Sequence, residues 1–202
     1  RGNMYNWLNP TTQNQSIPWR NTFSGTPTMR QAIYGDIMLC SNGSFPSLGS
    51  TAYPQYTYFA INLNASKGAI GSILWTNNVN WPAGNITTIS YAGMDASGYF
   101  CESYRQTQQF VFWNLRTGAL IKMAEPQASL DFYGSNGPGT ISNCIAYGRC
   151  YSSAYSGVLY CYDMATGNVL WTYGNGGAGN TTNSGFQVPG PYPTFINAIG
   201  NG

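Results

Sequence analysis

The side chains that could carry acid–base or metal chemistry are few in this chain, and they are far apart in sequence. The 202 residues include six carboxylates and no histidine. The absence of histidine excludes a Ser-His-Asp triad, a His-Cys dyad and histidine-ligated metals. General acid–base catalysis and calcium binding need several carboxylates in one place. The sequence therefore predicts no catalytic, cofactor-binding or metal-binding residue among its scattered acids, which are Asp36, Asp95, Glu102, Glu125, Asp131 and Asp163.

The five cysteines are a second group with chemical potential. They do not form a CxxC pair, so a zinc site or a thioredoxin-like motif has no support. In an oxidising compartment, Cys144 and Cys150 in the segment NCIAYGRC could close a small loop as a disulfide. The alternative is that all five are small buried hydrophobic residues, and the sequence leaves this choice open for Cys40, Cys101, Cys144, Cys150 and Cys161.

The composition limits the classes of partner. Charged residues make up 7% of the chain and the net charge is +2, against about 25% charged residues in an average domain. There is no basic cluster, which argues against nucleic acid as a partner. No apolar stretch is long enough to span a membrane as a helix. A surface with so little charge must be kept soluble by amides and hydroxyls, by attached sugar, or by packing into an assembly.

Five N-x-[ST] sequons are candidates for glycosylation. Their number is close to what chance gives in a chain this rich in Asn, Ser and Thr, so their placement is the stronger argument. Four of the five fall in predicted loops or turns, where a glycan would face water. If the chain is secreted, the sequence predicts surface glycans at Asn14, Asn42, Asn64, Asn85 and Asn180.

The elements that would position these residues are β-hairpins, and one hairpin is repeated. Residues 158–173, VLYCYDMATGNVLWTY, read as a strand, a tight turn and a second strand. Gly167 can adopt the positive φ that such a turn needs. Asp163 can hydrogen-bond the turn amides that follow it. Thr166 in the turn and Trp171 in the second strand complete the pattern.

Two further copies of this hairpin precede it. In residues 110–123, Gly118 lies 49 residues before Gly167, and Lys122 stands where the pattern expects Trp. A looser copy lies at 58–76, with a longer path between turn and second strand. The remaining pattern residues are Asn114 and Thr117 in the first of these copies, and Asn62, Gly68 and Trp75 in the second. A unit of about 50 residues with four strands is typical of a propeller blade.

The motif D-x-x-T-G-x-x-x-W in residues 163–171 resembles the PQQ-like (quinoprotein-type) repeat of β-propellers. The resemblance covers residues from about 30 to the end and is strongest in the third copy. It implies an all-β chain of four-stranded antiparallel blades, in which Trp75 and Trp171 dock on glycines of neighbouring blades. Three blades cannot close a ring, so the propeller is expected to be incomplete in this chain.

This repeat divides the chain into five units. Residues 1–30 are an extended arm or the outer part of a preceding blade. Residues 31–80, 81–130 and 131–190 are one blade each, and residues 191–202 begin a further blade. Because neither end has the character of a tail, the chain is expected to be a fragment of a longer polypeptide. Its composition resembles that of secreted surface proteins of prokaryotes, including archaea.

These observations favour a non-catalytic role outside the cell. The expected function is an extracellular or cell-surface β-propeller scaffold that binds proteins or glycans, as a subunit of an assembly. The partners are other blades or chains that complete the propeller. The alternative is a segment of a PQQ-dependent quinoprotein dehydrogenase whose catalytic residues lie outside these 202 residues. The repeat signals a fold and does not imply that a cofactor is bound.

Overall fold

The described part of the chain consists almost entirely of antiparallel β-sheet. The computed structural model describes residues 27–43, 56–79, 89–104, 106–127, 142–153, 158–173, 196 and 199–200. Its strands form three four-stranded sheets, each a simple meander of consecutive strands. The first sheet contains β1 (Thr28–Ile33), β2 (Ile37–Asn42), β3 (Tyr56–Asn62) and β4 (Ile73–Val79). The second contains β5 (Ile89–Asp95), β6 (Tyr99–Tyr104), β7 (Gln109–Asn114) and β8 (Leu120–Met123). The third contains β9 (Ser142–Ala146), β10 (Arg149–Ser153), β11 (Leu159–Asp163) and β12 (Asn168–Tyr173).

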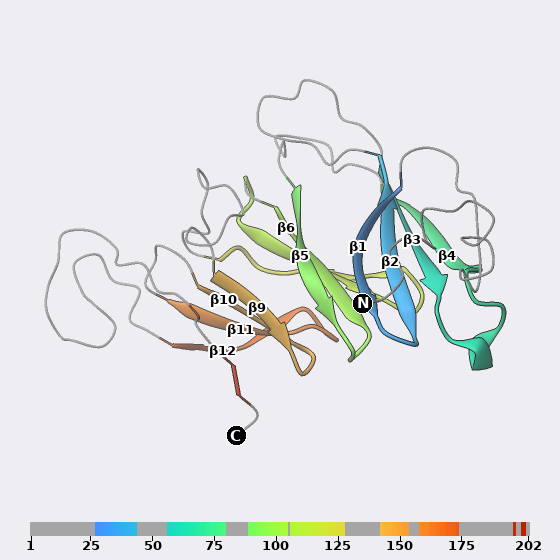
Figure 1. The fold of residues 1–202 in the computed structure, drawn as a ribbon. Helices are drawn as coiled ribbons and strands as arrows, with labels where there is room; N and C mark the ends of the chain where they lie inside the picture. The colour runs from blue at the N-terminus through green and yellow to red at the C-terminus, as the bar shows by residue number, and fades with distance from the viewer. Residues whose placement is uncertain are drawn as a thin grey trace, which may run out of the picture.

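The three sheets pack face to face in sequence order, like the blades of a fan (Figure 1). The first strand of each sheet lies next to the first strand of the neighbouring sheet, so β1 contacts β5 and β5 contacts β9. This arrangement confirms the predicted fold class, an all-β propeller that is incomplete in this chain. None of the described helical residues forms a segment long and apolar enough to cross a bilayer.

The predicted turn chemistry is present in the hairpins. In the turn between β7 and β8, Asn114 Oδ1 accepts hydrogen bonds from the amides of Arg116 and Thr117, at 2.8 and 3.1 Å. The amide of Gly118 donates to the Asn114 carbonyl at 2.8 Å, and Gly118 has a φ of 72°. An L-residue with a side chain rarely adopts this φ, which explains the glycine.

The turn between β11 and β12 is built in the same way. The amide of Gly167 donates to the Asp163 carbonyl at 2.7 Å. The hydroxyl of Thr166 donates to Asp163 Oδ2 at 2.8 Å. Asp163 is therefore occupied in holding its own hairpin, as the sequence indicated.

In the first hairpin the turn glycine is Gly71, and the placement of Gly68 there was wrong. The amide of Gly71 donates to the Asn62 carbonyl at 2.8 Å, as the glycines do in the other two hairpins. Gly68 ends a short 3-10 helix, Ala65–Lys67, which is inserted before that point. Because this insertion lengthens the loop, counting along the sequence selected a glycine three positions too early.

The first strand begins at Thr28, so the first sheet starts inside the segment 1–30 that the sequence assigned to an arm. Residues 1–26 and nearly all of 191–202 lie outside the described residues. The predicted arm and the predicted start of a further blade therefore stay predictions.

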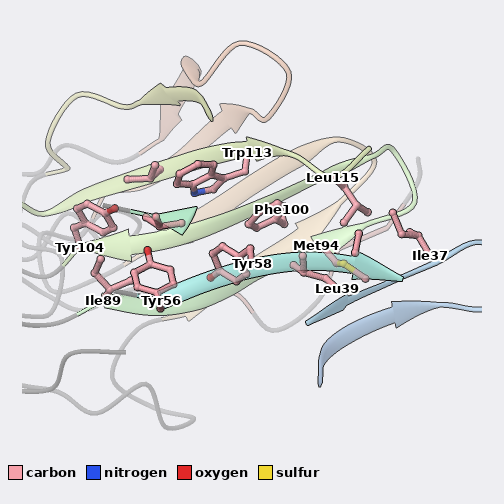
Figure 2. Packing of buried hydrophobic residues seen from close by; sticks show 13 residues of the cluster. Ile37, Leu39, Tyr56, Tyr58, Ile89, Met94, Phe100, Tyr104, Trp113 and Leu115 are labelled. Atoms are coloured by element: carbon pink, nitrogen blue, oxygen red, sulfur yellow. The ribbon is translucent and has the colours of Figure 1, made fainter. Parts of the chain in front are cut away.

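The largest apolar core lies between the first and second sheets (Figure 2). Aromatic rings dominate it: the centroids of Tyr58 and Phe100 are 5.0 Å apart, and Phe100 stacks on Trp113 at 6.0 Å. A second cluster, between the second and third sheets, contains Phe110, Phe112, Tyr162 and two cysteines. The faces between sheets thus hold the molecule together, because one sheet alone cannot bury its two surfaces.

The predicted pairing of Cys144 with Cys150 is not favoured by this geometry. All five cysteines are present as thiols. Cys144 is paired across the ladder with Tyr151, whereas Cys150 is paired with Ile145. Paired residues share a face of the sheet and successive residues alternate between faces. The side chains of Cys144 and Cys150 therefore lie on opposite faces of the third sheet.

Candidate functional site

Trp75 on β4 contacts the turn between β7 and β8 of the second sheet. A Cβ atom placed on Gly118 would lie 2.4 Å from Cε3 of the Trp75 indole, so the ring lies directly against the glycine. The indole N–H donates to the carbonyl of Leu115 at 2.8 Å. Asn77, two residues further along β4, donates through Nδ2 to the Gly118 carbonyl at 2.7 Å. The turn glycine thus serves both its own hairpin and the neighbouring sheet.

The contact between the second and third sheets repeats this arrangement with a different residue. Lys122 occupies on β8 the place that Trp75 has on β4. A Cβ atom on Gly167 would lie 2.7 Å from Cβ of Lys122. The Lys122 ammonium donates to Oδ1 of Asn168 at 2.6 Å. The aliphatic part of the lysine therefore covers the glycine, as the methylene stem of a lysine can. Its ammonium group extends beyond the glycine to Asn168.

In the third sheet the corresponding position is held by Trp171. The described residues include no turn glycine that packs against it. Trp171 on β12 corresponds to Trp75 and Lys122, and its side chain is 45% exposed. Its ring lies 6.1 Å from that of Tyr151. The ladder places both on the sheet face that points away from the second sheet, together with Cys144 and Cys161. This face, defined by Cys144, Tyr151, Cys161 and Trp171, is named the open face below.

A buried carboxylate lies between the first two sheets. Glu102 on β6 is fully buried. Its Oε1 accepts hydrogen bonds from the hydroxyls of Tyr56 and Tyr58, both at 2.8 Å and both from β3 of the first sheet. Its Oε2 accepts from the indole N–H of Trp113 at 3.1 Å. Both carboxylate oxygens are therefore occupied by donors, and the cluster ties β3 to β6 and β7.

The electrostatics of this cluster are dominated by burial. Removal from water raises the pKa of Glu102 to about 7, and the three hydrogen bonds oppose that rise by favouring the charged form. The positive charge of Arg30 on β1 acts in the same direction as the hydrogen bonds. Burial, and the nearby carboxylate, raise the pKa values of the Tyr56 and Tyr58 hydroxyls well above their usual range. The tyrosines therefore remain donors at any physiological pH, while Glu102 can change its charge.

Among the described residues, the second interface has no equivalent of this polar cluster. The ladders place Ser152 at the position of Glu102 and Phe110 at the position of Tyr58. The carboxylate and a hydroxyl that binds it are thus replaced together. A buried carboxylate without hydrogen-bond donors is costly. Replacing the carboxylate together with its donor avoids that cost.

Three of the other four described acids, Asp36, Asp95 and Asp163, support turns or contacts between sheets. Asp36 accepts from Arg116 and Lys67, which lowers the pKa of its carboxyl to about 2. Oδ2 of Asp95 accepts from the amide of Gly148 at 2.6 Å and so joins the second and third sheets. Among the described residues, three or more potential metal ligands do not come together anywhere. Glu125 is exposed, and Asp131 lies outside the described residues.

Two of the five sequons fall in the described part. Asn64 begins the short 3-10 helix, and its Oδ1 accepts from the amide of Ser66 at 2.9 Å. Asn42 is the last residue of β2 and is half-buried, so it does not lie in a loop as expected. Asn14, Asn85 and Asn180 lie outside the described residues.

Sequence reasoning missed the cluster around Glu102. The tyrosines that bind it come from another sheet, 44 and 46 residues away in sequence. The available signal was a glutamate inside the strand YFCESY, whose other side chains are apolar or small. A carboxylate in such a place needs buried donors.

No family model matches this chain, and no curated protein sequence matches it. Among solved structures, it is similar to BamB from Moraxella catarrhalis, with a TM-score of 0.44 and 14% identity over 91% of this chain and 48% of BamB. It is similar to the computationally designed Ika4 protein, with a TM-score of 0.40 and 13% identity over 76% of this chain and 75% of that one. It is also similar to a europium-containing methanol dehydrogenase, with a TM-score of 0.38 and 12% identity over 73% of this chain and 27% of the enzyme. The chain thus spans about half the length of BamB.

Proposed function

We propose that this chain is part of a non-catalytic, extracellular or cell-surface β-propeller scaffold that acts by binding proteins or glycans. In this proposal the open face of the third sheet receives a further sheet of the same repeat. The observation that supports a further sheet is the exposure of Trp171. At the two preceding sheets the corresponding residue covers a turn glycine of the next sheet, and at the third it is exposed. The further sheet is expected to present a glycine to the indole.

Two other features support a scaffold. Asp36, Asp95 and Asp163 hold turns or neighbouring sheets, and both oxygens of Glu102 are bound by buried donors. With so few charges, the surface also gains solubility if sugar is attached, and Asn64 at the start of the 3-10 helix is a described candidate for that attachment.

Oxidative footprinting of Trp171 tests the proposal. In the isolated chain the exposed indole is expected to be oxidised readily by hydroxyl radicals. In native material that contains the further sheet, we expect its oxidation rate to fall at least tenfold, because the ring becomes buried. Trp113 is the internal control, since its side chain is 5% exposed in the chain alone and should be protected in both samples.

Intact mass spectrometry of the same native material, before and after deglycosylation, shows whether the further sheet belongs to the same chain or to a partner chain. A polypeptide heavier than 22.0 kDa after deglycosylation places the further sheet in the same chain, whereas a second polypeptide of different mass places it in a partner. Equal oxidation of Trp171 in both samples would contradict the proposed use of the open face. A co-purifying quinone would contradict the non-catalytic role.

A further inference from the structure

At the interface between the second and third sheets, residues of one sheet face residues of the other in pairs. These pairs run from the first strands, β5 and β9, towards the last strands, β8 and β12. At the inner end, a Cβ atom on Gly93 would lie 2.9 Å from Cδ1 of Ile145. At the outer end, Gly167 lies against Lys122. At each end a glycine leaves room for a side chain of the facing sheet to lie directly against the backbone.

The middle of this interface follows from the ladders. The rings of Phe112 and Tyr162 face each other with centroids 5.8 Å apart. Paired residues of a ladder share a face, so the row that contains Phe112 must lie opposite the row that contains Tyr162. On β5, β6 and β7 the first row is Gly93, Cys101 and Phe112, and on β9, β10 and β11 the second is Ile145, Cys150 and Tyr162.

Cys101 and Cys150 are therefore opposite each other between two pairs that are in contact. Both thiols are fully buried in the same apolar cluster. The Cys150 thiol is near enough to Cys101 to add, after burial, to the rise in the pKa of the Cys101 thiol. Burial raises the pKa of the Cys101 thiol well above its usual range, so in the folded, reduced chain the thiolate needed for exchange is scarce.

We propose that Cys101 and Cys150 form a disulfide under oxidising conditions and so tie the second sheet covalently to the third. Disulfides between two packed sheets occur in antibody domains. With a small-molecule disulfide as oxidant, one cysteine thiolate attacks it and releases one thiol. The other cysteine then attacks the mixed disulfide and releases the second thiol. Two cysteines lose two hydrogens, and one disulfide molecule is reduced to two thiols.

Refolding the full chain from urea with reduced and oxidised glutathione tests this proposal, because unfolding exposes both thiols to the oxidant. The expected product is 2 Da lighter than the reduced chain and contains a cross-linked peptide pair joining Cys101 to Cys150. Cleavage after tyrosine separates Cys150 from Cys161, since Tyr151 lies between them. We expect the thermal midpoint of the oxidised chain to rise by roughly 5 to 10 °C, as closing a long loop does, and to return on reduction.

Two variants serve as controls. Cys144→Ala removes a thiol from the opposite face of the same sheet and should leave the cross-linked peptide and the midpoint shift unchanged. Cys150→Ala should abolish both. The proposal is overturned if refolded wild type, shown to be folded by circular dichroism, retains five free thiols, carries only glutathione adducts, or joins a different pair.

Discussion

Replacing Gly118 by alanine is expected to destabilise the chain by about 2 to 5 kcal/mol. Two costs combine at this residue. A φ of 72° costs an L-residue about 1 to 2 kcal/mol. The new methyl group would also lie 2.4 Å from the Trp75 ring, and such overpacking costs a further 1 to 3 kcal/mol or so. The free energy of unfolding, measured by urea titration with tryptophan fluorescence, checks this value.

Gly35 is the matched control for this experiment. Its φ is 68°, close to that of Gly118, but an added Cβ would meet no atom within 4 Å. Gly35→Ala should therefore show the backbone cost alone, about 1 kcal/mol after the gain from a less flexible unfolded chain. In a Trp75→Ser background, Gly118→Ala should cost no more than Gly35→Ala. If Gly118→Ala and Gly35→Ala were equally destabilising in the wild-type background, the contact of Trp75 with the glycine would not be what stabilises this interface.

The local features of the fold could be predicted because they depend on neighbours in sequence. A turn that begins with Asp or Asn and contains Thr-Gly needs only four or five residues to form its hydrogen bonds. Lys122 could be placed at the Trp position by counting from Gly118, and the structure shows it against Gly167. Where the loop length changed, counting failed, and Gly68 was selected in place of Gly71.

The contacts between sheets could not be predicted in the same way. Glu102 reads as an isolated acid along the chain, and its donors become visible only when β3 lies against β6 and β7. The spacing of Cys144 and Cys150 suggested a short loop, but the alternation of side chains sends them to opposite faces. Cys101 and Cys150 are 49 residues apart, and only the packing of the second sheet on the third brings them together.

Glu102 links the stability of the chain to pH, and Glu102→Gln is expected to abolish that link. The folded pKa of about 7 lies above the ordinary value of 4.5, so the folded state holds the proton more tightly than the unfolded state. The stabilisation that comes from binding this proton in the folded state is fully present below pH 4.5. It is lost as pH rises through about 7. The difference corresponds to a decrease of about 2 to 3 kcal/mol in the free energy of unfolding between pH 5 and 8.

The composition makes this pH range favourable for the measurement. The chain has no histidine, so no imidazole titrates between pH 5 and 8. Asp36, with its pKa lowered to about 2, contributes a stabilisation that is lost only in more acidic solution, as pH falls below about 4. The groups around Glu102 include Arg30 from β1, Tyr56 and Tyr58 from β3, Tyr104 from β6 and Trp113 from β7. Burial raises the pKa values of the tyrosine hydroxyls well above their usual range, so these groups stay neutral throughout.

Urea titrations of wild type and Glu102→Gln at pH 5, 6, 7 and 8 measure the effect. The variant should be less stable than wild type at pH 5, by about 1 to 3 kcal/mol, because the amide group places an N–H against the donor of Trp113. Its stability should then stay constant up to pH 8, so the two curves converge. Glu125→Gln, at an exposed acid, should keep the wild-type slope. A Glu102→Gln variant that retained the wild-type slope would show that a group other than Glu102 causes it, and that Glu102 is already ionised at pH 5.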